Sequence, residues 1–322
     1  MARFPKGPAL VHKILVIDPR QKNVKPGWLG PEYNVVQPAS YELENIMEEI
    51  RDAEGILTAF RPVPSELMEA VPGLKVVARP GAGIDNIDVE AATRLGVRVC
   101  NVTGVRGRAL AEHALFLMLY LARHAWMKDD PEGWEATPPI QLTGRTMGVV
   151  GLGDIGRNVV KIGHGFGLEI LVNTRTPDPA YVPEAAIEFV SFEKMCPRAD
   201  FIVLAMPLTP ETRGFTRAET IGWMKKEVII INLARGQAVV TGDLLEAVRA
   251  GRIAGAGLDV TDPEPLPADH LLRSIPQVLI TPHNGSRTAE TTAKAMGRSA
   301  DNIRKALAGE RPINLVNPEV MD

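Results

Sequence analysis

The sequence predicts an α/β protein with two domains, each built on a parallel sheet. Short apolar runs of strand length alternate with helical patterns in two blocks, and one long apolar helix lies between the blocks. Glycine and proline are unusually frequent, with 29 Gly and 26 Pro among 322 residues and no periodic repeat. This excess indicates many turns between short elements, as in chains that alternate strands and helices.

In the first block, four apolar runs have the length of buried strands, and they lie at 13–18, 55–58, 75–78 and 97–100. The helical patterns between them lie at 41–52, 65–70 and 88–95. The long apolar helix is expected over 109–126. In the second block, strand-like runs lie at 146–150, 169–173, 200–205, 227–231, 254–260 and 278–281. Helices are expected at 154–165, at 244–250 after a candidate cap in Thr241–Asp243, and at 289–308.

The composition excludes several classes of protein. Apolar residues form 45% and charged residues 23% of the chain, the proportions of a folded globular protein rather than a disordered one. The net charge of −3 gives no basic excess for nucleic acid, and Cys100 and Cys196 lack the spacing of a metal site. The most apolar helical stretch, near 115–121, falls well short of the roughly 20 residues that cross a bilayer. We therefore expect a cytoplasmic protein with no metal ion and no nucleic-acid or membrane partner.

Gly151, Gly153 and Gly156 form a G-x-G-x-x-G loop directly between a predicted strand and a predicted helix. Gly151 permits the tight turn, Gly153 lets a pyrophosphate approach the backbone, and Gly156 lets the helix pack close to the strand. The first N–H groups of the helix would then bind the phosphates. Glycine-rich turns are common, but the strand–turn–helix context favours a dinucleotide-binding Rossmann domain over a structural turn.

The second strand of this domain ends without the acid that usually bonds the ribose hydroxyls of NAD. Thr174 and Arg175 stand there, and the first acid is Asp178. A carboxylate would repel the 2′-phosphate of NADP, whereas an arginine can pair with it. We therefore expect NADP(H) to be favoured. The alternative is that Arg175 stacks on adenine or faces solvent, which leaves NAD(H) open.

Polar residues follow three strands of the second block at the ends where parallel sheets bind ligands, and they are Arg235, Asp259, Glu264 and His283. Hydride addition to a ketone builds negative charge on its oxygen, so it needs a proton donor that works near neutral pH, and histidine is such a group. Glu264 would fix the tautomer of His283, and Arg235 would hold a substrate carboxylate. The alternatives are structural roles for all three. The five other histidines are expected to be structural: His12, His113, His124, His164 and His270.

Gly81, Ala82 and Gly83 follow a strand end in the first block. Closely spaced glycines expose N–H groups that can cradle a carboxylate, although a structural turn is the alternative. A substrate held there would face the nicotinamide across a cleft between the two domains.

Together these motifs resemble those of the D-isomer-specific 2-hydroxyacid dehydrogenases. The segments that carry the resemblance are the glycine loop, 232–236, 258–265 and 281–283, with further matches at 81–88, 111–113 and 207–209. The residues whose roles the resemblance implies are the catalytic Arg235, Glu264 and His283, the substrate contacts Ala82 and Gly83, and the cofactor contacts Asp154, Ile155, Pro207 and Asp259. It also implies a Rossmann domain over 104–288, a discontinuous substrate-binding domain over 1–103 completed by 289–322, and a homodimer.

Thr174 and Arg175 further resemble the NADP-preferring glyoxylate/hydroxypyruvate reductases. We expect an oxidoreductase that transfers hydride between NADP(H), or NAD(H), and a small 2-oxo acid or D-2-hydroxy acid such as glyoxylate or hydroxypyruvate. The alternatives are a nucleotide-sensing interaction module of the corepressor type and a short phosphoglycerate dehydrogenase.

Overall fold

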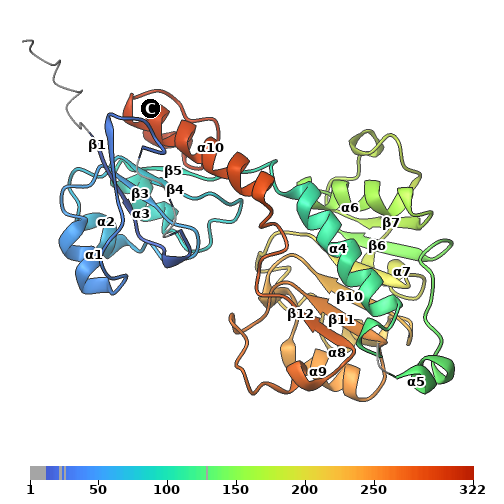
Figure 1. The fold of residues 1–322 in the computed structure, drawn as a ribbon. Coiled ribbons are helices and arrows are strands. Elements are labelled where there is room, and N and C mark those ends of the chain that lie inside the picture. The colour runs from blue at the N-terminus through green and yellow to red at the C-terminus, as the bar shows by residue number, and fades with distance from the viewer. Residues whose placement is uncertain (1–11, 22–23, 25–26, 128–129) are drawn as a thin grey trace, which may run out of the picture. The chain divides into compact units, whose positions relative to one another are not determined.

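The computed structural model describes residues 12–21, 24, 27–127 and 130–322, and the chain divides into two compact units. Unit 1 contains the described residues up to Val105 together with Thr292–Asp322, and unit 2 contains Arg106–Thr291. Each unit has one sheet whose strands all run parallel (Figure 1). The predicted fold class, two α/β domains with parallel sheets, is confirmed.

The sheet of unit 1 has five strands in the order β2-β1-β3-β4-β5. They are β1 (His12–Val16), β2 (Tyr33–Val36), β3 (Gly55–Leu57), β4 (Val76–Ala78) and β5 (Arg98–Cys100). The helices are α1 (Leu43–Glu49), α2 (Ser65–Glu69), α3 (Val89–Arg94) and most of α10 (Ala289–Leu307). Ala300, Ile303 and Ala306 of α10 share an apolar cluster with Ile14 and Val16 of β1, so the end of the chain packs on its first sheet.

The sheet of unit 2 has seven strands in the order β12-β11-β10-β9-β6-β7-β8. They are β6 (Thr146–Val150), β7 (Glu169–Asn173), β8 (Ile187–Phe189), β9 (Phe201–Leu204), β10 (Ile229–Asn232), β11 (Gly255–Leu258) and β12 (Val278–Ile280). The helices are α4 (Gly107–Ala122), α5 (Pro131–Ala136), α6 (Asp154–Gly165), α7 (Phe192–Met195), α8 (Ala218–Gly222) and α9 (Thr241–Arg249). Short 3-10 turns in the two units lie at Pro19–Gln21, Ala125–Met127, Pro179–Tyr181, Gly236–Ala238, Leu271–Ser274 and Pro318–Met321.

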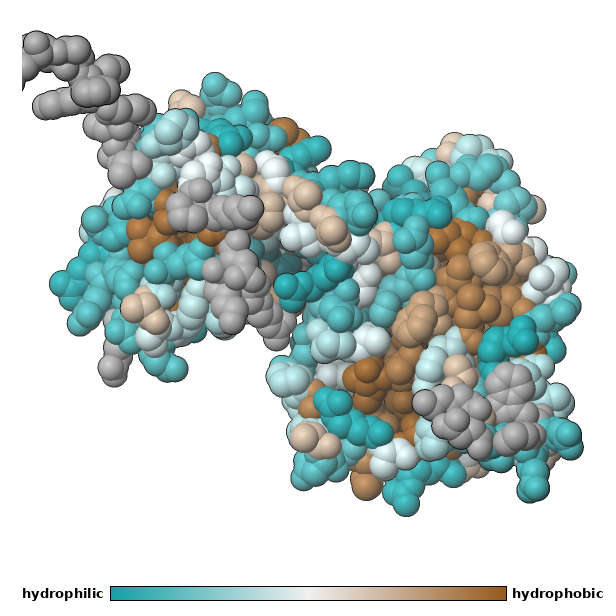
Figure 2. Space-filling model, viewed as in Figure 1, coloured by the Kyte–Doolittle hydropathy of each residue, from teal (hydrophilic) through white to brown (hydrophobic). Residues whose placement is uncertain are grey.

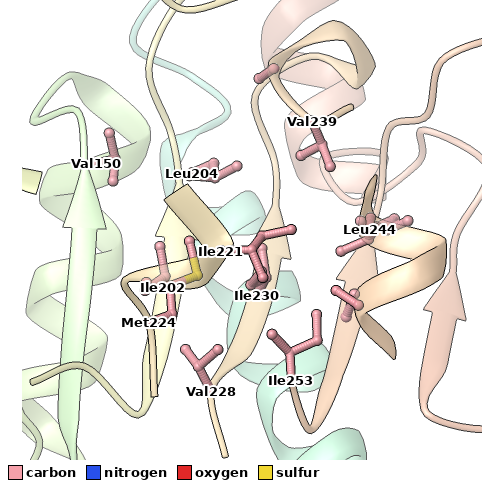
Figure 3. Close-up of a cluster of buried hydrophobic side chains, with 14 of the residues drawn as sticks. Val150, Ile202, Leu204, Ile221, Met224, Val228, Ile230, Val239, Leu244 and Ile253 are labelled. Atoms are coloured by element: carbon pink, nitrogen blue, oxygen red, sulfur yellow. The ribbon is translucent and has the colours of Figure 1, made fainter. Parts of the chain in front are cut away.

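Apolar side chains cover both faces of the unit 2 sheet. Ile229 and Ile231 of β10 join the cluster beneath α4 and α6, whereas Ile230 joins the cluster beneath α8 and α9 (Figure 3). This alternation follows from strand geometry, in which successive side chains point to opposite faces. Each such isoleucine contributes about 1.5–3 kcal/mol by its burial. The sheet is therefore a rigid layer on which strand-end loops can be mounted.

The strand order of unit 2 reverses at β6. The chain runs from β6 outward through β7 and β8, then returns to β9 on the other side of β6. Loops that leave the carboxyl ends of β6 and β9 consequently diverge, and α/β proteins bind their ligands at such a switch point. The glycine loop follows β6 directly, which places it at this position.

The structure differs from the sequence predictions in several places, and the short helices α5, α7 and α8 were among the elements not predicted. β2 and β8 are edge strands that the sequence analysis did not identify, and both are incompletely buried. The helix expected over 109–126 ends at Ala122, and His124 takes a left-handed backbone with φ of 49°. The predicted cap of α9 was wrong: Thr241 is the first helical residue, and its hydroxyl donates to the Asp262 carbonyl at 2.6 Å.

Candidate active site

The glycine loop joins β6 to α6 with a geometry that requires two of its glycines. Gly151 has φ of 94°, and a Cβ there would lie 2.9 Å from the Met206 backbone. A Cβ on Gly156 would lie 2.0 Å from the Gly151 carbonyl oxygen. Gly153 differs, because no atom lies within 4 Å of its Cβ position. The Cβ position of Gly153, at the start of α6, therefore faces open space, which the close approach of a pyrophosphate would require.

Three more expected cofactor contacts border this loop. Asp154 is the first residue of α6, and its Oδ2 accepts the Gly107 N–H at 2.9 Å, which ties the start of α4 to the start of α6. Ile155 packs against the cluster beneath the two helices. Pro207 lies just beyond β9, and its carbonyl accepts the Thr212 hydroxyl at 2.8 Å. All three thus lie in elements that leave the switch point.

Thr174 and Arg175 follow the end of β7, and Arg175 is exposed. Hydrogen bonds from the Thr209 side chain and from the backbone lower the pKa of the exposed Glu211 carboxyl, and the charge of Arg175 lowers it further. Arg175 is therefore close enough to Glu211 to interact with it. The side chain of Arg175, which is expected to bind the 2′-phosphate, is thus exposed to solvent and carries its charge near that of Glu211.

His283 and Glu264 form a pair beyond β12 and β11. The His283 Nδ1 lies 2.7 Å from Glu264 Oε1, and the two side chains are 25% and 30% exposed. Because a carboxylate only accepts, this contact assigns a proton to Nδ1 and turns Nε2 away from the glutamate. His283 has φ of 52°, a left-handed conformation that costs about 1–2 kcal/mol in a non-glycine residue.

Asp259 holds the backbone on both sides of His283. It is 2% exposed, and it accepts the Thr281 hydroxyl at 2.7 Å. It also accepts the N–H groups of Asn284 at 3.0 Å and Gly285 at 3.1 Å. These bonds offset the cost of the left-handed residue between them and fix the direction of its imidazole. Asp259, expected to contact the cofactor, thus has its carboxylate engaged with the loop.

Arg235 lies at the start of the turn after β10, next to the loop that carries Glu264. The fully buried Asn232 donates to the Arg235 carbonyl at 2.9 Å and accepts the Ala234 N–H at 3.0 Å. A Cβ on Gly236 would lie 1.9 Å from the Thr261 carbonyl oxygen, so only glycine permits the contact between the two loops. The predicted residues Arg235, Glu264 and His283 therefore follow three adjacent strands of one sheet edge.

Ala82 and Gly83 lie in unit 1 beyond β4, in a loop fixed through its carbonyl groups. Asn101 donates to the Ala82 carbonyl at 2.7 Å. Arg79, which is 8% exposed, donates to the carbonyls of Gly83 and Ala59. The supporting role of this buried arginine could not be predicted from the sequence, because its two acceptors are backbone atoms that leave no sequence pattern.

Burial sets the ionisation of several groups in the molecule. It raises the pKa of Cys100 and of Cys196 to about 12, so neither thiol is reactive near neutral pH. It also lowers the pKa of His113, and the nearby Asp259 opposes this only in part. Among the described residues, no cluster of three or more His, Cys, Asp or Glu could hold a metal ion. Within the same ranges, no helix has the length and apolar character that a membrane span requires.

Comparison with known proteins identifies the family of the chain. Residues 114–285 match the family described as "D-isomer specific 2-hydroxyacid dehydrogenase, NAD binding domain". The chain belongs to this family and is therefore an oxidoreductase, a 2-hydroxyacid dehydrogenase with an NAD(P)-binding domain. The family predicted from the sequence motifs is confirmed.

Individual relatives cover most of the chain. A glyoxylate reductase from Aeropyrum pernix is 36% identical over 88% of this chain and 88% of its own length. A D-3-phosphoglycerate dehydrogenase from Methanocaldococcus jannaschii is 38% identical over 95% of this chain and 59% of its own length. The solved NADPH-dependent glyoxylate/hydroxypyruvate reductase from Sinorhizobium meliloti, in complex with NADP and malonate, is 27% identical with a TM-score of 0.80, covering 96% of this chain and 97% of its own.

Proposed function

We propose that the protein reduces small 2-oxo acids such as glyoxylate or hydroxypyruvate with NADPH. The observation that carries the proposal is the His283–Glu264 pair, mounted beside the Arg235 loop on the sheet edge that also carries the glycine loop. Bound at the glycine loop, the dinucleotide would supply a hydride. The naming of relatives as glyoxylate reductases supports the choice of acid.

Each residue has a distinct part in this proposal. His283 donates a proton from Nε2 to the substrate oxygen, while Glu264 keeps the ring oriented through Nδ1. Arg235 binds the substrate carboxylate and stabilises charge on the oxygen being protonated. Unit 1 would act as the substrate-binding domain, with Ala82 and Gly83 contributing the substrate contacts of that unit. Unit 2 acts as the dinucleotide-binding domain.

We propose contacts to the dinucleotide at both of its ends. The N–H groups of the glycine loop and of Asp154 and Ile155 would bind the pyrophosphate, and Pro207 with Asp259 would border the nicotinamide half. Thr174 and Arg175 would bind the 2′-phosphate, which is the basis for a preference for NADPH over NADH. The exposed position of Arg175 and the presence of NADP in the Sinorhizobium relative support this preference.

A screen of 2-oxo acids with each reduced cofactor tests the function. Oxidation of NADPH with glyoxylate or hydroxypyruvate, at a higher kcat/KM than with NADH, is the expected result. The screen includes 3-phosphoglycerate with the oxidised cofactors, because the Methanocaldococcus relative makes that activity the second candidate. Binding of cofactor without turnover of any acid would instead favour a nucleotide-sensing module.

We also propose that the protein is a cytoplasmic homodimer joined through the outer face of α4. Figure 2 shows apolar residues on the face of unit 2 that α4 crosses in Figure 1. Phe116 of this helix is 48% exposed, and it belongs to a row of ring contacts that runs from His113 through Phe116 and Tyr120 to Trp126. A second copy of the chain would cover this face. Light scattering with Phe116→Glu tests it, because that substitution should give a monomer; a wild-type monomer would exclude the dimer.

A further inference from the structure

His113, expected from the sequence to be structural, contacts the loop that carries His283. It lies on α4, and α4 packs so closely on β11 that a Cβ on Gly257 would lie 2.9 Å from the Leu117 side chain. The His113 Nε2 lies 2.9 Å from the Thr281 hydroxyl and 3.6 Å from Asp259 Oδ1. The side chain is 14% exposed. A helix on one face of the sheet thus reaches the strand-end loops.

The protons in this cluster can be assigned by counting donors. The Thr281 hydroxyl has one proton, and it donates this proton to Asp259, because a carboxylate only accepts. The same hydroxyl oxygen must therefore accept from His113, so Nε2 of His113 carries a proton. Burial lowers the pKa of His113, which favours the neutral ring, and in the neutral ring the single proton is the one on Nε2. The result is a series of two hydrogen bonds, in which His113 donates to Thr281 and Thr281 donates to Asp259.

The His113 ring also packs directly against the loop. A Cβ on Gly285 would lie 2.5 Å from His113 Cδ2 and 2.9 Å from Asp259 Oδ2. Gly285 is therefore held between the imidazole and the carboxylate that accepts its N–H. Since Asp259 holds Thr281 on one side of His283 and Asn284 with Gly285 on the other, movement of His113 would release both sides.

We propose that His113 is a positioning residue, which acts through Thr281 and Asp259 to hold the His283 loop in its working conformation. This inference rests on the proposed function, because it assigns a purpose to the orientation of His283. His113 itself touches neither substrate nor the reacting atoms in this proposal. Its contribution is the fixed direction of another imidazole, and a displacement of about 1 Å at a reacting group can lower turnover by roughly 100-fold.

Kinetics of four variants test the proposal. His113→Leu and Thr281→Val each remove a member of this hydrogen-bond series. We expect kcat to fall by roughly 10- to 100-fold in each variant, with the KM for the dinucleotide nearly unchanged. His113→Gln keeps a donor near the Nε2 position and should retain most of the turnover. The double variant His113→Leu/Thr281→Val should lose no more than either single variant, because both remove the same support. His164→Leu, an exposed histidine at the end of α6, is the matched control and should match wild type.

Two further measurements distinguish failure of this inference from failure of the proposed function. Nitrogen-15 NMR of the imidazoles should show His113 neutral and protonated at Nε2, and the Asn284 and Gly285 amide signals should shift in His113→Leu. If His283→Gln stops turnover while His113→Leu retains the wild-type kcat, the positioning role is wrong. If His283→Gln retains full turnover, the proposed function is wrong. In that case the positioning role is judged from the Asn284 and Gly285 amide signals of His113→Leu alone. Unchanged signals would overturn the positioning role, and shifted signals would support it.

Discussion

Two loops that follow strand ends, one in each unit, are held by the same arrangement but carry different side chains. In unit 1, Asp18 lies just beyond β1 and accepts N–H groups from residues 59–61, which follow the neighbouring β3. In unit 2, Asp259 lies just beyond β11 and accepts N–H groups from Asn284 and Gly285, which follow the neighbouring β12. The two carboxylates are 1% and 2% exposed.

The difference lies in what surrounds each carboxylate. The unit 1 loops are joined by Arg79, whose guanidinium is always charged and donates to backbone carbonyls. The unit 2 loops carry His283 paired with Glu264, groups that can gain and lose protons. One backbone arrangement therefore supports a loop held by a fixed charge in one unit and, in the other, the pair to which we assign proton transfer. The comparison teaches that function resides in the side chains mounted on a shared loop support, not in the support itself.

The largest effect is expected for His283→Gln, and its comparison with Arg79→Lys distinguishes a role in proton transfer from a role in binding the acid. His283→Gln should lower kcat by roughly 10²- to 10⁴-fold, because the substitution removes the proton donor. Cofactor affinity, measured by fluorescence titration with NADPH, should be retained. Arg79→Lys in unit 1 should instead raise the KM for the acid, since it loosens a binding loop. Equal loss of kcat in both variants would abolish the distinction between the two loops.

Asp18→Asn and Asp259→Asn test the shared support directly. Each removes charge-assisted bonds worth about 1.5–3 kcal/mol, so both variants should unfold at lower urea concentration than wild type. Their kinetics should differ, with Asp259→Asn lowering kcat and Asp18→Asn raising the KM for the acid. If both variants change kcat and the KM for the acid in the same way, the two loops do not have separate roles in catalysis and substrate binding.

Two substitutions in the glycine loop of unit 2, Gly156→Ala and Gly153→Ala, form a matched pair. Gly156→Ala places a methyl group on the Gly151 carbonyl, and we expect it to destabilise the protein by about 1–3 kcal/mol. Gly153→Ala meets open space and should leave the melting temperature unchanged while weakening dinucleotide binding. Calorimetry and NADPH titration measure the two effects. Undiminished NADPH affinity in Gly153→Ala would mean that the pyrophosphate does not approach this glycine.

The smallest expected effect concerns cofactor choice. Thr174→Asp restores an acid beyond β7, and it should shift the ratio of kcat/KM for NADPH over NADH by about tenfold or more toward NADH. Arg175→Ala should move the ratio in the same direction through loss of the phosphate partner. Steady-state kinetics with both cofactors measures the shift. If neither substitution changes the ratio of kcat/KM for NADPH over NADH, Thr174 and Arg175 are not the source of the cofactor preference.

Local patterns predicted the alternating elements and the glycine loop, because buried parallel strands are continuous apolar runs and the turn needs glycine at fixed spacing. The edge strand β8 escaped prediction because Glu188 points outward between partly buried Ile187 and Phe189. The role of Thr241 was mispredicted because its partner, Asp262, comes from a distant loop. The contact of His113 with Thr281 spans 168 positions, and no local pattern encodes such a pair. Side chains that support a site from another element therefore require the structure.

Turnover of glyoxylate and hydroxypyruvate by the wild-type protein and by His283→Gln, with NADPH and then NADH, tests the central claim most directly. The wild-type protein should oxidise NADPH with at least one of these acids and do so more efficiently than NADH, while His283→Gln should bind NADPH and turn over at least roughly 100-fold more slowly. Equal turnover by the two proteins would contradict the assignment of His283 as the proton donor.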